Sequence, residues 1–450
     1  DVLIGVPGIH IGAESLAIGT PFPNIRGITG SFGRNVKVLV DGIPFEDMGQ
    51  GGSAFYKHPL ISNLKRIEVV KGPGSVVYGA DAIAGVVNLV SPEAGSQDYN
   101  HLNLRTGEEG HRDIAFSHGG ASENGISWYT GVEYSESKLG DGPIINSDLQ
   151  TVFDGIFGTQ ASLAPSHLSD QHKILNIHLK MEYGPWSLKH FYHDGEGNGR
   201  TGAANALDDR GFLEAVRSNT QITYTIKQLE KYLPGTLTLA GTFYYQDGQN
   251  RFNIFPPNSL FPVGDDGNLF SPGGGLVFFP DGVRGTPGTY GRRTDLQLTH
   301  QYRMDNGHDL RTQIGIDNNR YRVSEIKNFG PGVLDNIVYP ADGSPYVANT
   351  LVDVTNTPYV YSEPGNRRIW WLSFQDEWQA AKDLSFSLGI RYNKYDDFGS
   401  TTNPRLGLNW TLNSQWSLRA FYGSAFREPK FSELNLRNNP SALGNPDLRP

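Results

Sequence analysis

The stretch "PFEDMGQGGSAFYKHP", residues 44–59, brings together side chains that can bind a polar or metal-containing ligand. It contains two carboxylates, a phenol, an ammonium group and an imidazole, in the order Glu46, Asp47, Tyr56, Lys57 and His58. Carboxylates and imidazoles are common metal ligands, and such a mixture of charged and aromatic groups suits a metal chelate. Because glycine and serine separate these residues, a solvated loop rich in turns is the alternative interpretation.

Histidine, with twelve residues, raises the possibility of a metal site elsewhere in the chain. The closely spaced histidines are His111 with His118, His172 with His178 and His190 with His193. None of these pairs has the i, i+4 spacing of a helical metal site, and histidines scattered on polar strand faces explain them. His10 and His58 are the only histidines before residue 95. The chain has no cysteine and therefore no thiolate site, so we expect no resident metal.

Sequence motifs typical of enzymes are not found. The chain contains no G-x-S-x-G, H-E-x-x-H or P-loop pattern, and "SPGGG" (271–275) lacks the strand and helix that a phosphate loop needs. We therefore expect a protein that is not an enzyme and that uses no cofactor.

The composition is that of a large β protein. Charged residues make up 19% and hydrophobic residues 37% of the 450 residues, which is too apolar for disorder and too polar for a helical membrane protein. Abundant glycine and aromatic residues favour many strands and turns. The net charge of −9 argues against a nucleic-acid partner. No signal peptide is recognised, and no stretch reaches the roughly 18 apolar residues of a spanning helix.

The most apolar run, "RIEVVKGPGSVVYGADAIAGVVNLVS" (66–91), must be built as short elements. Its glycines and its proline exclude a membrane-spanning helix. The run predicts two buried strands separated by turns at "GPGS" and "YGAD". Together with the alternating strand "NVKVLVDGIPF" (35–45), it predicts a small α+β domain that ends near residue 95.

Beyond residue 96 the chain alternates between apolar and polar residues. In "LSFSLGIRY" and "LNIHLKMEY" the apolar side chains fall on one face and the charged ones on the other, as in a sandwich or a transmembrane barrel. We count about thirteen such segments, near 100–107, 110–118, 126–136, 172–183, 186–195, 218–229, 235–247, 292–304, 308–322, 367–380, 382–396, 403–411 and 415–426.

Loop lengths favour the barrel. The long excursions 137–171, 196–217, 248–291 and 323–366 all follow odd-numbered segments, whereas the connections after even-numbered segments are tight. An outer-membrane barrel has short turns at its periplasmic rim and long loops at its outer rim. Tryptophan and tyrosine near segment ends suit the aromatic girdles of such a barrel. Because thirteen strands cannot close a bacterial barrel, we expect that C-terminal strands are missing from this chain.

Three motifs resemble the plug of TonB-dependent outer-membrane receptors: "NIRGITG" (24–30), "VKVLVDGIPF" (36–45) and the run 66–91. The later motifs "TNPRLGLNW", "FREP" and "GNPDLRP" also look like this family. The resemblance implies a plug (1–95) inside the lumen of a 22-stranded barrel (96–450), with about nine further strands. It also implies a monomer among outer-membrane lipid and lipopolysaccharide, driven by the TonB–ExbB–ExbD complex. The family's TonB box is not present in this chain.

The resemblance also implies roles for individual residues. The apical plug loops, 28–35 with Arg34 and 44–59 with the side chains named above, are expected to meet the ligand. A latch between plug and barrel is expected to use Arg26 and Arg66 with acidic partners, for which Glu133 and Glu377 have the strand parity of lumen residues. The plug is expected to depend for its turns and close packing on Gly72, Pro73, Tyr78, Gly79 and Gly85.

For the imported ligand the resemblance favours a ferric siderophore. Haem is the second possibility, because "FREP" and "NPDL" resemble motifs of haem receptors, although residues 430–445 lack the histidine expected between them. Another metal complex, cobalamin or a sugar is also possible. A passive porin or a surface adhesin would be a protein of a different class, and the plug-like residues 1–95 argue against both.

Overall fold

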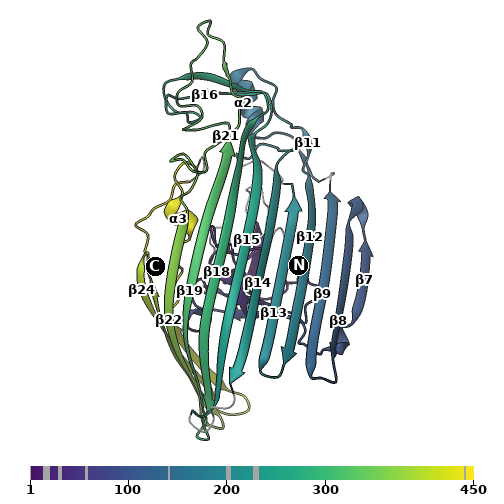
Figure 1. Cartoon of the computed structure of the whole chain (residues 1–450), viewed down its shortest axis with the longest axis vertical. Helices are drawn as coiled ribbons and strands as arrows, with labels where there is room; N and C mark the ends of the chain where they lie inside the picture. The colour runs from purple at the N-terminus through teal and green to yellow at the C-terminus, as the bar shows by residue number, and fades with distance from the viewer. Residues whose placement is uncertain are drawn as a thin grey trace.

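The structure is a computed structural model that describes residues 2–13, 21–28, 33–55, 59–139, 142–198, 204–226, 233–439 and 442–449. Most of these residues belong to strands, and one large antiparallel sheet dominates the molecule (Figure 1). No helix in the described part of the chain is long and apolar enough to cross a membrane.

The large sheet has fourteen strands, and thirteen of them form a continuous path in which each strand pairs with the next one in antiparallel fashion. The fourteenth is the short β21 (Val352–Asp353), which pairs with one of these strands beside the path. We call the thirteen strands of the path the wall. It consists of β7 (His101–Thr106), β8 (Arg112–Ala121), β9 (Ile126–Leu139), β12 (Asp170–Tyr183), β13 (Trp186–Gly197), β14 (Phe212–Ile226), β15 (Thr236–Phe255), β18 (Val283–Arg303), β19 (His308–Lys327), β22 (Gly365–Ala381), β23 (Leu384–Tyr395), β24 (Gly399–Thr411) and β25 (Ser417–Gly423). Each of the thirteen predicted segments is one of these strands, so the strand prediction is confirmed.

The two faces of the wall differ in polarity, as the alternation predicts. On β23, Leu388, Ile390 and Tyr392 are exposed on the convex face, whereas Arg391 and Asn393 are buried on the concave face. This is the reverse of a water-soluble sheet, which turns its apolar side chains inward. The arrangement fits a wall that faces lipid on its outside and a polar lumen on its inside.

The N-terminal residues lie against the concave face of the wall (Figure 1). We call the described residues up to 95 the plug. It contains β1 (Ile9–Ala13), β2 (Pro21–Ile25), β3 (Val36–Val40), β4 (Ile43–Pro44), β5 (Arg66–Lys71), α1 (Ser75–Tyr78) and β6 (Gly85–Val90). The strands β4, β3, β6 and β5 form one mixed sheet in that order, in which β3 and β6 run parallel.

The run 66–91 departs from the prediction in two respects. Of the two strands expected to be buried, only β6 is buried along nearly its whole length, because β5 is the edge strand of the plug sheet and its terminal residues are exposed. The segment between them also contains a single turn of helix, α1, and not turns alone. Tyr78 ends this helix and packs on Leu39 and Val86.

Two plug glycines occupy positions that a side chain would disturb. Gly79 follows α1 with a φ of +80°, a conformation that favours glycine. A β-carbon on Gly85 would overlap the carbonyl oxygen of Val70 on the neighbouring strand. Gly72 and Pro73 form the connection between β5 and α1.

The long excursions gather at one end of the wall, at the top of Figure 1, and share an apolar core. Phe255, Phe261 and Phe279 lie at its centre, and Phe153 packs on them from a helix. The elements of this region are β10 (Ile144–Ile145), α2 (Leu149–Phe157), β11 (Ser166–His167), β16 (Ser259–Val263), β17 (Gly275–Phe279), β20 (Tyr346–Val347) and β21 (Val352–Asp353). Short turns join the strands at the opposite end. The remaining helices are the 3-10 turns η2 (Gln97–Tyr99) and η3 (Glu108–Gly110), and α3 (Phe431–Asn435).

Candidate functional site

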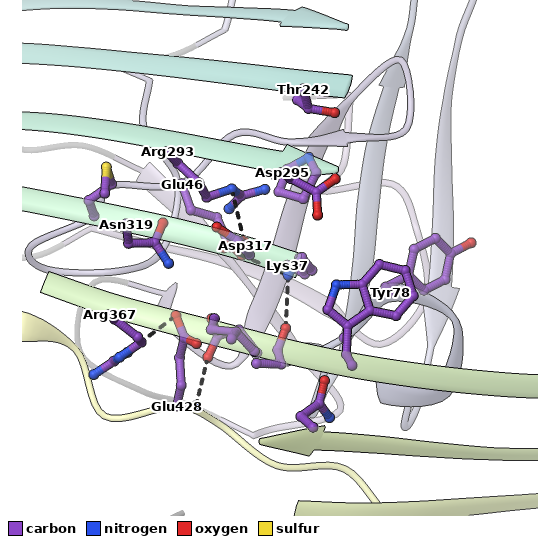
Figure 2. Close-up of a pocket in the computed structure, with 18 of the residues that line it drawn as sticks. Lys37, Glu46, Tyr78, Thr242, Arg293, Asp295, Asp317, Asn319, Arg367 and Glu428 are labelled. Carbon is purple, nitrogen blue, oxygen red and sulfur yellow. Dashed lines mark hydrogen bonds and ion pairs between the residues drawn. The ribbon is translucent and has the colours of Figure 1, made fainter. Parts of the chain in front are cut away.

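The interface between plug and wall contains a polar cavity of about 190 Å³ (Figure 2). Plug residues 37–48 and 77–81 line one side of it. The opposite side is formed mainly by lumen-facing residues of β18, β19, β22 and β23. Because the family-like motifs 36–45 and 66–91 both contribute to this lining, the cavity is the natural place to look for function.

The predicted ligand residues of the second apical loop are only partly described. Tyr56, Lys57 and His58 lie outside the described residues. Asp47 accepts hydrogen bonds from Arg217 of β14 at 2.9 Å and from Gln246 of β15 at 3.1 Å. It therefore ties the loop to the wall in this structure.

The other two predicted ligand residues also have structural partners. Glu46 is buried, and its carboxylate lies 3.8 Å from the ammonium group of Lys37. Arg34 pairs with Glu433 at 2.8 Å. Contact of these residues with a ligand stays a prediction.

In the described part of the chain, the residues expected in the latch make other contacts, and their role as a latch stays a prediction. Arg66 bonds to Glu68 of its own strand at 2.7 Å, because β5 is an edge strand that leaves this pair half exposed. Arg26 is exposed at the end of β2. Glu377 is exposed on β22 and accepts a hydrogen bond from Ser387 of the adjacent strand.

Glu133 contacts the plug through a residue that is neither Arg26 nor Arg66. Its carboxylate accepts a hydrogen bond of 3.0 Å from the backbone N–H of Asn63. The Asn63 side chain in turn donates to the carbonyl of Phe116, and Tyr129 donates to the carbonyl of Asn63. Asn63 is therefore the centre of a plug–wall contact that the sequence analysis did not identify.

Two further contacts between plug and wall were also missed. Lys180 of β12 pairs with Asp41 at 2.8 Å, and both side chains are more than nine-tenths buried. Lys189 of β13 donates to the carbonyl of Asp41 at 3.2 Å. The sequence does indicate that Lys180 can reach the plug, because the alternation of "LNIHLKMEY" places it on the polar, lumen-facing side of its strand.

The chain that follows β25 folds back over the plug. We call residues 424–438 the strap. Lys430 forms ion pairs with Asp81 of the plug and, at 3.0 Å, with Glu428 of the strap. The backbone N–H of Asp81 donates to the carbonyl of Phe426. The strap thus closes one edge of the cavity.

Burial acts on the pKa values of the two carboxylates that contact Lys430. It raises the pKa of Asp81 to about 6, although the Lys430 ammonium opposes the change. Burial also acts to raise the pKa of Glu428, but the neighbouring Lys430 and Arg367 hold it at about 2. The pKa values of the two carboxylates around this ammonium group are therefore shifted in opposite directions.

The wall side of the cavity is charged, and some of its charged residues form ion pairs. Arg293 and Asp317, on adjacent strands, form an ion pair with 3.4 Å between guanidinium and carboxylate, which a dashed line marks in Figure 2. Arg367 of β22 pairs with Asp397 at 2.8 Å. Within the described ranges, no group of three or more acidic or histidine residues is placed to hold a metal. The arrangement suits a polar surface along which two parts of a protein can separate.

Comparison with known proteins places both regions in one family. Residues 1–86 match the family model described as TonB-dependent Receptor Plug Domain, and residues 164–450 match TonB dependent receptor-like, beta-barrel.

Two curated relatives are named Vitamin B12 transporter BtuB. The relative from Vibrio vulnificus is 34% identical over 452 residues, and the one from Photobacterium profundum is 21% identical over 454 residues. Each match covers 100% of this chain and 59% of the relative, so the chain spans less than two thirds of their length.

Solved structures share the fold at low identity. The siderophore receptor PirA from Acinetobacter baumannii aligns with a TM-score of 0.60 and 16% identity, over 95% of this chain and 58% of that one. The copper transporter OprC aligns with a TM-score of 0.63 and 15% identity, over 96% of this chain and 60% of that one.

Proposed function

Because the chain belongs to the TonB-dependent receptors, we propose that it serves the energy-dependent import of a scarce small ligand across a bacterial outer membrane. The observation that carries this proposal is the plug seated on the polar face of the wall through ion pairs and hydrogen bonds. A passive porin needs no such plug. Import of this kind would draw its energy from the TonB–ExbB–ExbD complex, while the convex apolar face contacts outer-membrane lipid.

We propose the following division of the chain. Residues 1–95 form the plug and residues 96–450 belong to the barrel. The contacts of Asp41, Asn63 and Asp81 with the wall or the strap all begin in the first region. The side chains of Arg34, Glu46 and Asp47 remain the proposed apical contacts of the ligand.

A cobalamin-type ligand is the first candidate for the cargo. The likeness to vitamin B12 transporters extends over the whole chain. The long loop between β19 and β22, residues 328–364, supports it, because this loop carries four acidic residues, Asp335, Asp342, Asp353 and Glu363, and no lysine or arginine. An acidic rim repels a strongly anionic ferric catecholate but tolerates cyanocobalamin, which has no net charge. A neutral ferric siderophore is the alternative, and it remains compatible with the first expectation for the family.

Uptake measurements test this proposal. Cells with and without the gene are given radiolabelled cyanocobalamin in the presence and absence of an uncoupler of the inner-membrane proton gradient. We expect gene-dependent accumulation that the uncoupler abolishes. Accumulation that continues with the uncoupler would contradict energy-dependent import. If radiolabelled ferrichrome accumulates in its place, the function is retained and the ligand class is corrected.

A further inference from the structure

The contacts between the plug and the wall are distributed unevenly among the wall strands. We call β9, β12, β13, β14 and β15 the anchoring strands and β18, β19, β22 and β23 the cavity strands. Four anchoring strands contribute charged side chains that bind the plug, and these are Glu133 of β9, Lys180 of β12, Lys189 of β13 and Arg217 of β14. The distances are, in the same order, 3.0 Å to the N–H of Asn63, 2.8 Å to the carboxylate of Asp41, 3.2 Å to the carbonyl of Asp41 and 2.9 Å to the carboxylate of Asp47.

Aromatic packing strengthens the same side. The ring of Phe45 in the plug lies 5.0 Å from Phe191 of β13, and the ring of Phe55 lies 5.9 Å from Phe191. Tyr244 of β15 adds a hydrogen bond of 2.9 Å to the carbonyl of Glu46. These aromatic side chains are buried, so separating them exposes apolar surface to water.

The cavity strands hold the plug differently. Arg293 and Asp317 pair with each other within the wall, and the guanidinium of Arg391 lies over the ring of Trp371. Among the described residues, no ion pair joins the plug to these four strands. The hydrogen bond of 3.1 Å from Ser373 to the carbonyl of Val76 is a direct contact here. The polar cavity of about 190 Å³ lies between the plug and these strands, so separation at this side exposes surface that is already polar. A larger cavity of about 560 Å³ lies between the plug and β7, β8 and β9, but its plug side is mostly apolar, with residues such as Ile61, Ile67 and Leu89, so separation there exposes apolar surface.

The strap fastens the plug on the cavity side. Besides the Lys430–Asp81 ion pair, Glu433 pairs with Arg34 of the plug at 2.8 Å. Ser432 donates its backbone N–H to the carbonyl of Gly49 at 3.0 Å. The strap belongs to the chain after β25 and is not a strand of the wall, so it can move without breaking the sheet.

We infer that transport opens a passage between the plug and the cavity strands after the strap releases Asp81, while the plug stays attached to the anchoring strands. The inference rests on the proposed transport function and adds the route to it. Three observations carry it: ion pairs and aromatic packing on one side, a polar cavity without plug–wall ion pairs among the described residues on the other, and a movable segment that bridges the cavity side.

Two engineered disulfides of similar geometry test the route, and the chain offers no competing cysteine. A β-carbon built on Gly389 of β23 lies 2.8 Å from a γ-carbon of Val76, and one built on Gly131 of β9 lies 3.1 Å from the γ-carbon of Asn63. Both values are close to the distance of about 3 Å between a β-carbon and the far sulfur of a disulfide. The variant Val76→Cys/Gly389→Cys locks the cavity side, and Asn63→Cys/Gly131→Cys locks the anchored side.

The two variants are compared in the full-length protein, oxidised and then reduced, with radiolabelled cyanocobalamin as the probe. We expect oxidation of Val76→Cys/Gly389→Cys to abolish uptake, and reduction to restore it. Oxidation of Asn63→Cys/Gly131→Cys should leave the uptake rate of the reduced protein unchanged. The inference is overturned if the anchored-side disulfide also blocks uptake, or if the cavity-side disulfide does not.

A second measurement does not depend on the identity of the cargo. Single cysteines replace Gln313 of β19 or Asn176 of β12, two lumen-facing wall residues that are 4% and 1% exposed. Energised cells are treated with a bulky maleimide that cannot cross membranes, with an uncoupler as control. We expect energy-dependent labelling of Gln313→Cys and none of Asn176→Cys. Equal labelling, or labelling of Asn176→Cys alone, contradicts the route. Should cyanocobalamin fail as a cargo, this labelling pattern still decides the inference.

Discussion

Lys430 connects two carboxylates that come from distant parts of the chain. Its side chain is 5% exposed and that of Asp81 is 4% exposed, so both charges have lost most of their hydration. A buried ion pair of this kind contributes little net stability compared with an apolar pair, but removal of one partner leaves an unpaired buried charge. At the scale of single residues, the attachment of the plug therefore depends on a few buried ion pairs in which both partners must be present.

We expect Lys430→Ala to loosen the strap and the plug beneath it. The substitution removes the cation next to the buried carboxylates of Asp81 and Glu428. Loss of one partner of a buried ion pair lowers the stability of the fold by about 3–5 kcal/mol. Hydrogen exchange of residues 75–90 should become faster. The control is Lys173→Ala, which removes the exposed pair with Glu196 on β13 and should change stability by about 0–1 kcal/mol. Equal effects of the two substitutions would contradict the importance of burial.

The effect of Lys430→Ala should also depend on pH. Burial already raises the pKa of Asp81 to about 6, and loss of the neighbouring cation raises it further. An acid whose pKa is raised in the folded state destabilises that state more as the pH rises through the interval between its unfolded and folded pKa values. The loss of protection is the ratio of the protection factor of the natural protein to that of the variant at one pH. This ratio should therefore be larger at pH 8 than at pH 5. A ratio that grows toward pH 5 would contradict this assignment.

At the scale of elements, the plug sheet shows how the run 66–91 achieves its packing. The strand β6 lies between β3 and β5, and it is the most thoroughly buried strand of the run. The close approach of Gly85 to the backbone of Val70 allows β5 to pair with its start. The edge position of β5 explains why its first residue, Arg66, faces solvent.

Gly85→Ala should destabilise the plug. The added methyl group overlaps the carbonyl oxygen of Val70, so the pairing of β5 with β6 must shift, at a cost on the order of 1–3 kcal/mol. Thermal unfolding of the plug, followed by limited proteolysis, should occur at a lower temperature. Gly5→Ala is the matched control, because a β-carbon there meets no atom within 4 Å. An unchanged cleavage temperature for Gly85→Ala would mean that the strands adapt without cost.

At the scale of the whole molecule, the wall separates an apolar exterior from a polar interior. Exposed apolar side chains such as Leu372, Phe374 and Ile390 cover the convex face. The concave face holds the charged residues that meet the plug. A chain that buries its charges and exposes its apolar side chains is stable only where lipid covers the exterior.

Ile390→Arg tests this orientation. Ile390 is 47% exposed on the convex face of β23, and an arginine near the middle of a bilayer costs roughly 2–4 kcal/mol. The folded fraction after refolding into lipid vesicles should fall. The control Ile390→Leu keeps the apolar character and should refold as the natural protein does. A normal yield for Ile390→Arg would show that this position does not face the hydrocarbon.

The sequence by itself determined which residues form the wall strands and which face of each strand is polar. Strict alternation over ten or more residues has one stable solution, because a shift of one residue would turn every side chain to the opposite face. The segregation of long and short loops similarly determined the two rims. The plug motifs indicated a family, which the family models confirmed.

Only the tertiary structure decided which charged residues meet. Lys180 with Asp41 and Lys430 with Asp81 are each brought together by the position of the plug within the wall, and no local pattern encodes that distance along the chain. For the same reason, the latch prediction chose Arg66 by its motif, although an edge strand turns it toward Glu68. Periodicity specifies the face of a strand, but the partner across an interface depends on how two separately folded parts dock.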